Sequence, residues 1–135
     1  MKRRVGGTVT VLGVALMALH AFAHHAVQAQ FDFEKPLALT GVITKIEWVN
    51  PHSYMFLNVK DETGKVKRWA LEMVGPGGLR KAGLSRADRG GFKTGDTITV
   101  NGFASKDGSD SGFVKELKLP DGRLVTIWFG DPNAR

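Results

Sequence analysis

The chain has 135 residues and a hydrophobic fraction of 42%, values that fit one globular domain and leave no room for a second core. Its formal charge is +6, but removing residues 1–23 leaves 16 basic and 13 acidic side chains, a charge of +3. This small excess argues against a nucleic-acid partner. The absence of cysteine excludes disulfides and thiolate metal sites.

The N-terminal segment has the pattern of a signal peptide. A basic start at Lys2, Arg3 and Arg4 precedes a mostly apolar run over residues 9–19 and the small-residue sequence Ala21-Phe22-Ala23. The apolar run is shorter than the ~20 residues of a membrane span, although an uncleaved anchor is the alternative. We predict a signal peptide over residues 1–23, with a second candidate cleavage site after Ala29. The mature protein is therefore expected to be periplasmic or secreted, with no stable membrane span.

The first strand of the mature chain is predicted to follow an extended lead-in over residues 24–36, which ends in Lys35-Pro36. Leu37 and Leu39 then occupy alternate positions. The apolar positions change parity at Gly41, after which Val42, Ile46 and Trp48 continue the pattern. A glycine at such a change predicts a bulge or a sharp bend, so that one long strand can serve two parts of a barrel.

Further alternating segments predict the rest of the sheet. They are Met55 to Val59, Trp69 to Met73, Ile98 to Val100, Phe113 to Leu119 and Leu124 to Phe129. Glycine-rich residues 75–83 allow only a short helix or turn between the third and fourth strands. This order predicts an all-β, OB-fold-like barrel of five or six strands with one short helix over residues 37–129, followed by a flexible tail over residues 130–135. An open β-sandwich is the alternative.

The segment Trp48-Val49-Asn50-Pro51-His52 connects the first two strands and predicts a ligand site. A tryptophan, an amide and an imidazole near a strand end give the mixed apolar and polar lining of ligand sites. We therefore predict ligand binding by Trp48, Asn50 and His52. The alternative is a plain Asn-Pro turn in which His52 bonds locally.

Three histidines, His24, His25 and His52, are the candidate metal ligands of the mature chain. If cleavage follows Ala23, the amino group and imidazole of His24 suit copper or zinc, with His52 as a further ligand. Residues 24–36 and 37–49 each span about 43 Å when extended, so the lead-in must fold back along the first strand for these groups to meet. A solvated His24-His25 pair is the alternative. Met55 and Met73 fall on the apolar parity of their strands and are predicted to pack in the core.

The residues do not predict an enzyme. Ser53 beside His52 points to the opposite face of a strand, and Glu47 and Glu72 lie on separate strands without the motif of an acid/base pair. The basic and aromatic residues 65–69 could follow single-stranded nucleic acid on an OB surface, but export argues against that partner.

Several stretches together resemble one known family. They are His24-His25, Phe31-Asp32, Leu39 to Ser53, Gly95-Asp96, Lys106 to Ser109 and Leu119 to Arg123. They are similar to the small exported proteins of domain of unknown function family 6152, in which His-His-Ser-Phe is typical where this chain has His24-His25-Ala26-Val27. The resemblance implies a periplasmic or secreted domain and leaves its ligand open.

The leading hypothesis from the sequence is a non-enzymatic, exported binding module that takes a small ligand or a metal ion at the Asn-Pro-His loop. The alternative is a module that binds an envelope protein partner, or has a structural role, and takes no small molecule. In that case Trp128 and Phe129 are expected to be exposed and to form the docking surface.

Overall fold

The computed structural model describes residues 27–86 and 92–130 of the chain. The chain divides into two units, residues 1–30 and 31–135, and residues 27–30 of the first unit are helical. The predicted signal peptide, His24 and His25 lie outside the described residues. Within the described ranges, every helix is too short or too polar to cross a bilayer.

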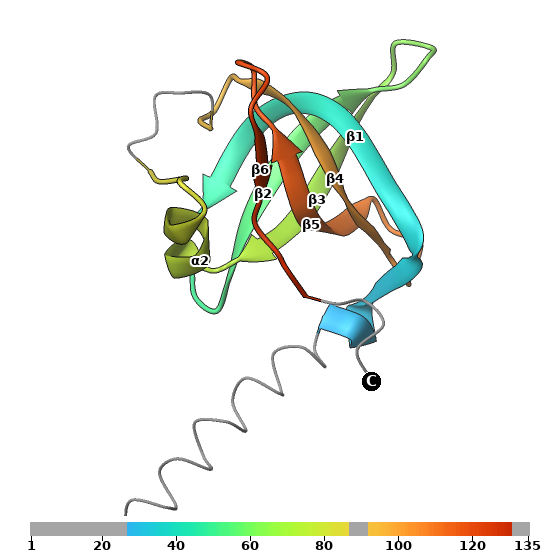
Figure 1. The fold of residues 1–135 in the computed structure, drawn as a ribbon. Coiled ribbons are helices and arrows are strands. Elements are labelled where there is room, and N and C mark those ends of the chain that lie inside the picture. The colour runs from blue at the N-terminus through green and yellow to red at the C-terminus, as the bar shows by residue number, and fades with distance from the viewer. Residues whose placement is uncertain (1–26, 87–91, 131–135) are drawn as a thin grey trace, which may run out of the picture. The chain divides into compact units, whose positions relative to one another are not determined.

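The described residues of the second unit form a barrel of six strands and one short helix (Figure 1). The elements are β1 (Phe31–Glu47), β2 (His52–Lys60), β3 (Val66–Val74), α2 (Pro76–Lys81), β4 (Thr97–Ser105), β5 (Ser111–Lys118) and β6 (Leu124–Thr126). The sheet order is β3-β2-β1-β4-β5-β6, and a parallel pairing between β3 and β5 closes the first five strands into a ring. The predicted OB-fold-like barrel is therefore confirmed, with its helix between β3 and β4.

Strand β1 has two partners along its length. Residues from Phe31 to Val42 pair with β4, and those from Val42 to Glu47 pair with β2. Figure 1 shows β1 as one long arched ribbon. It begins at Phe31, so residues 31–36 of the expected lead-in are part of this strand. The single strand thus joins two sides of the ring.

The predicted change of parity at Gly41 is wrong in position. Gly41 and Ile43 both face the interior, Val42 is 40% exposed, and the register shifts between Ile43 and Lys45. Gly41 has a different role, since a Cβ there would lie 2.5 Å from the backbone oxygen of Asn58. The glycine permits close approach of β1 and β2, and the bulge near Thr44 changes the parity.

The barrel interior is a continuous apolar core closed at one end by α2 and the segment that follows it. Its members are Ile43, Met55, Leu57, Leu71, Met73, Leu79, Leu84, Phe92, Ile98, Val100, Val114, Leu117, Leu119, Val125 and Ile127. Met55 and Met73 are completely buried, which confirms the prediction that they pack in the core. Without disulfides, this burial is the main source of stability.

A cluster of aromatic side chains covers part of the outside of the barrel. Trp128 packs against Phe33, Phe103 and Phe113 with ring centroids 5.5–5.8 Å apart, and only 8% of Trp128 is exposed. The expectation of an exposed Trp128 is therefore wrong, because the strand ends at Thr126 and the following residues fold back onto these rings. Phe129 is 84% exposed, as expected.

Candidate functional site

The β1–β2 connection places Trp48 at the edge of the core. Its ring packs edge-on against Phe92 at 5.7 Å between centroids and is half-buried beside the core cluster. The guanidinium of Arg86 donates a hydrogen bond to the carbonyl oxygen of Trp48 at 3.1 Å. These contacts hold Trp48 against the segment that follows α2.

A cavity of about 300 Å³ lies beside the Trp48 ring. It is lined by Trp48, Pro76, Arg80, Leu84, Ser85 and Arg86. Its walls therefore come from the end of β1, from both ends of α2 and from the segment after the helix. We call this space the Trp48 cavity. Its volume is at the lower end of the range for small-molecule sites.

Gly75 fixes the position of α2 relative to the β1–β2 connection. A Cβ at this residue would lie 2.6 Å from the carbonyl oxygen of Pro51 and 3.1 Å from Oδ1 of Asn50. Glycine therefore lets the backbone before α2 pack directly on the Asn50-Pro51 corner, where the peptide bond is cis. Pro76 then begins the helix at a position where proline needs no hydrogen-bond donor.

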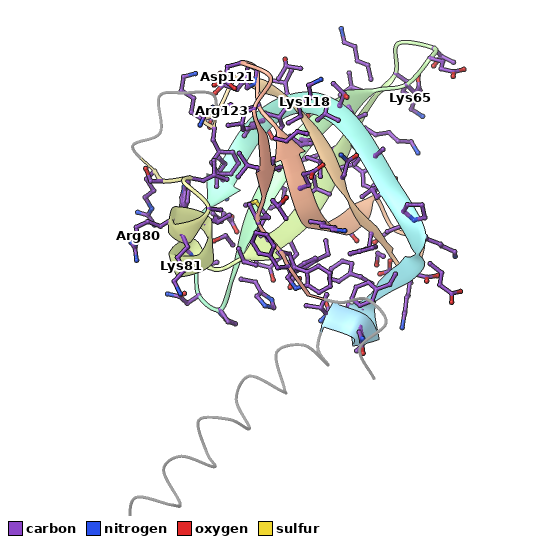
Figure 2. The ribbon with its side chains drawn as sticks, in the orientation of Figure 1. Lys65, Arg80, Lys81, Lys118, Asp121 and Arg123 are labelled. Atoms are coloured by element: carbon purple, nitrogen blue, oxygen red, sulfur yellow. The ribbon has the colours of Figure 1, made fainter. Side chains whose placement is uncertain are left out.

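Among the described residues, the charged groups that line the Trp48 cavity are both cationic. Arg80 belongs to the last turn of α2, where Figure 2 shows Arg80 and Lys81 projecting away from the strands. Arg86 uses part of its guanidinium fork for the Trp48 carbonyl and keeps further N–H donors. Within the ranges that the structure describes, neither arginine forms an ion pair with a carboxylate. An apolar wall under two guanidinium groups can hold a small anion with an apolar body.

Of the predicted ligand residues, Trp48 alone lines this cavity. Asn50 is exposed at the corner against Gly75, and His52 belongs to a different group of side chains on the outer face of the sheet. The three side chains diverge, because His52 is already the first residue of β2 and turns its side chain outward.

His52 pairs with Glu72 of β3. Its Nδ1 contacts Oε1 of Glu72, and the two side chains are 22% and 11% exposed. The Phe113 ring lies edge-on to the imidazole at 6.3 Å. Glu72 is thus nearly buried. Because Nδ1 contacts a carboxylate, Nε2 is the imidazole nitrogen that can bind another partner.

Tyr54 completes this group, since it lies opposite Glu72 in the β2–β3 register and opposite Glu47 in the β1–β2 register. Burial raises the pKa of the Tyr54 phenol above its usual value of 10.0. The negative charge of Glu72, a hydrogen bond to Glu72 and the charge of Glu47 raise this pKa further. We call His52, Glu72 and Tyr54 the histidine–carboxylate group.

The metal prediction involves His24, His25 and His52. The first two lie outside the described residues. Among the residues that are described, no three histidine, aspartate or glutamate side chains are arranged to hold a metal ion. Copper or zinc binding therefore stays a prediction.

Arg80, Arg86 and the pairing of His52 with Glu72 are features of the candidate site that the predictions from the sequence do not include. The sequence did contain an indication of this pairing. Counting residues outward from the Asp61–Gly64 turn places Glu72 opposite Tyr54, two residues from His52 on the same strand. No sequence pattern indicated the two arginines, because their approach to Trp48 depends on where α2 and the segment after it pack.

The comparisons with known proteins agree with the resemblance described above. No curated protein matches the chain significantly. The model of a family whose description is "Family of unknown function (DUF6152)" matches residues 11–115. With most of its length covered, the chain belongs to this family.

Proposed function

We propose that the protein is an exported, non-enzymatic binding module that takes a small organic anion in the Trp48 cavity. The observation that supports this proposal is the combination of an indole wall with two arginines that have no carboxylate partner among the described residues. The leader-like residues 1–23 support a periplasmic or secreted location.

The lining favours a ligand with two distinct parts. Trp48 and Pro76 offer apolar surface, and Arg80 and Arg86 offer donors at the rim. A carboxylate or sulfonate accepts paired N–H donors from arginine, and its ring or short chain then covers the indole. Benzoate and hexanoate have this form.

The lining also favours binding over catalysis. Among the described residues that line the cavity, Ser85 supplies the one side-chain hydroxyl, and there is no histidine or carboxylate to activate it. A ligand would therefore be held and released unchanged.

The test is a titration of the mature protein with benzoate and hexanoate, followed by NMR of the indole N–H groups. Benzamide and hexanol serve as the uncharged controls. We expect the Trp48 signal to shift with both anions, and Arg86→Gln to weaken binding by about tenfold, because a hydrogen bond between charged groups is lost.

Lys81→Gln is the matched control for Arg86→Gln. It removes one positive charge from the last turn of α2 without touching the cavity lining. Binding should be unchanged in this variant. Equal binding of benzoate and benzamide, or equal loss in Lys81→Gln and Arg86→Gln, would contradict the proposal.

A metal ion is the second candidate ligand, and the geometry of His52 favours it. Metal-binding histidines commonly donate their other ring N–H to a carboxylate, as His52 does to Glu72. Calorimetry with copper and zinc on the mature protein, with its N-terminus determined by mass spectrometry, tests this version. Binding weaker than micromolar, or unchanged in His52→Ala, rules it out.

The alternative from another class is an envelope protein-interaction module. Phe129 is 84% exposed and would belong to its docking surface. If the small anions and metal ions fail to bind, we expect Phe129→Ser to reduce capture of a defined envelope partner.

A further inference from the structure

A second hollow of about 630 Å³ lies on the outer face of the barrel. It is lined by Thr40, Val42, Asn58, Lys60, Val66 and Thr97, together with the backbone at Gly41. It shares no lining residue with the Trp48 cavity. We call it the outer groove.

The outer groove arises where β1 and β2 separate. Their pairing runs as far as Val42 opposite Asn58. Beyond that pair, Thr40 is paired with Thr99 of β4, and Lys60 is paired with Val66 of β3. The paired part of β1 and β2 thus ends beside Gly41, whose backbone still lies close to Asn58, and the outer groove lies at this end of the pairing.

The lining combines three kinds of surface. Val42 and Val66 are 40% and 47% exposed and form apolar patches. Thr40, Thr97 and the Asn58 amide provide hydrogen-bond donors and acceptors, and the Thr40 hydroxyl also bonds the Thr99 hydroxyl at 2.9 Å. Alternating apolar and hydroxyl-binding surface matches a sugar ring, which has C–H faces and a polar edge.

Positive charge lies along the same face. Lys60 is in the lining, and Arg68 lies opposite Asn58 in the β2–β3 register. Neither forms an ion pair with a carboxylate in the described part of the chain, whereas Lys45 pairs with Glu47 and Lys67 pairs with Asp110. Lys60 and Arg68 therefore have no competing carboxylate among the described residues, and their N–H donors can meet an anionic group of a ligand.

The aromatic residue of this face is less suited to nucleic acid. The guanidinium of Arg68 lies 4.7 Å from the centroid of the Phe56 ring, and the Lys45 ammonium lies 5.8 Å from it. Binding of single strands depends on aromatic rings open to stacking by bases. A ring already covered by cations does not offer that surface.

We propose that the outer groove binds an acidic oligosaccharide. Its carboxylate or sulfate groups meet Lys60 and Arg68, its hydroxyls bond Thr40, Thr97 and Asn58, and its C–H faces cover the two valines. The β2–β3 face of OB barrels is a general surface for oligosaccharides and oligonucleotides, and the charges here select the acidic sugars. This inference does not depend on the function proposed for the Trp48 cavity.

The experiment titrates the mature protein with tetragalacturonate, with maltotetraose as the uncharged sugar and with a ten-residue oligothymidylate as the nucleic acid. We expect tetragalacturonate to bind about tenfold or more tightly than maltotetraose, with an affinity that falls as salt rises. Oligothymidylate is expected to bind more weakly than tetragalacturonate.

Variants locate the binding on the surface. Lys60→Gln and Arg68→Gln should each weaken tetragalacturonate binding by about three- to tenfold, and Val66→Glu should abolish it by placing a negative charge in the groove. Lys67→Gln is the matched control. It also removes one positive charge, and Lys67 precedes Arg68 in sequence, but this lysine already pairs with Asp110. Arg86→Gln should have no effect.

Three results would overturn the proposal. They are equal binding of the acidic and neutral sugars, equal losses in Lys67→Gln and Lys60→Gln, and oligothymidylate binding as tight as that of tetragalacturonate. The folding of each variant is first compared with that of the parent protein by thermal unfolding. Lys60→Ala replaces Lys60→Gln if Lys60→Gln does not fold.

Discussion

Tyr54 shows at the scale of single residues how the outer face of the sheet is organised. Its phenol is partly buried, hydrogen-bonds Glu72, and also faces the charge of Glu47. All these surroundings disfavour the phenolate. His52 contacts the same Glu72, so one nearly buried carboxylate serves two partners from neighbouring positions of β2.

The pKa of Tyr54 is expected to fall toward 10.0 in Glu72→Gln. The substitution removes the negative charge that opposes ionisation, and burial remains as the main cause of the raised value. Because the chain has one tyrosine, alkaline titration of the tyrosinate absorbance reports this group alone.

Glu47→Gln is the control, since the charge of Glu47 is the smallest contribution to this pKa. It should lower the pKa less than Glu72→Gln does. The pKa of Tyr54 is higher in the folded protein than in the unfolded chain, so the protonated phenol contributes to the free energy of unfolding. This contribution is complete below pH 10 and is lost as pH rises through the folded-state pKa. Unfolding at alkaline pH should thus be less pH-dependent in Glu72→Gln.

At the scale of elements, two glycines illustrate opposite requirements. Gly41 lies where β1 and β2 approach closely, and a Cβ would be 2.5 Å from a backbone oxygen of Asn58 and 2.9 Å from Cγ2 of Val59. Gly77, within α2, has no atom within 4 Å of the Cβ position. The first glycine is needed for packing, whereas the second weakens its helix.

Gly41→Ala should destabilise the protein by about 1–3 kcal/mol, because backbone atoms cannot move away from the added methyl group without shifting a strand. Gly77→Ala should stabilise it by about 0.4–1 kcal/mol, because alanine restricts the unfolded chain and favours the helix. Urea unfolding measures both. Equal effects of the two substitutions would show that β1 and β2 are not in close contact at Gly41.

At the scale of the whole molecule, stability depends on closing the ring without a cross-link. Leu71 of β3 is completely buried, and its partner Gly112 of β5 belongs to the parallel pairing that closes the barrel. The core is small, so each buried side chain contributes a large share of the stability.

Leu71→Ala should lower the free energy of unfolding by about 2–5 kcal/mol, since it removes buried apolar surface and leaves a cavity. The same change at Leu124, which is 64% exposed, should cost less than about 0.5 kcal/mol. Chemical unfolding of both variants checks the prediction. A small effect at Leu71 would mean that the barrel is not closed between β3 and β5.

Much of the architecture could be predicted from the alternation of apolar residues. Leu57, Leu71 and Val100 are buried as their parity indicates, and the glycine-rich segment forms only the six-residue helix α2. The bulge near Thr44 could not be predicted, because a bulge changes the parity without requiring a particular residue type. The family could be recognised because the stretch from Glu47 to His52 is specific to it.

The candidate site was only partly predictable. Trp48 could be predicted because it stands beside a polar turn at a strand end, but its arginine partners lie 32 and 38 residues later in the chain. The position of that segment depends on how Leu79 and Leu84 fill the end of the barrel. Such packing follows from three-dimensional fit and leaves no local pattern.

The division of β1 between two partners has a consequence for folding. Residues 31–42 pair with a strand that begins at Thr97, so this part of the chain stays unpaired until β4 is also available to fold. During that delay its hydrogen-bonding edge is open to other chains. Glu34, Lys35 and Pro36 are exposed at a break in the register of this edge, where two charges and a proline discourage intermolecular strand addition. The folding polypeptide thus protects its earliest strand until its permanent neighbour arrives.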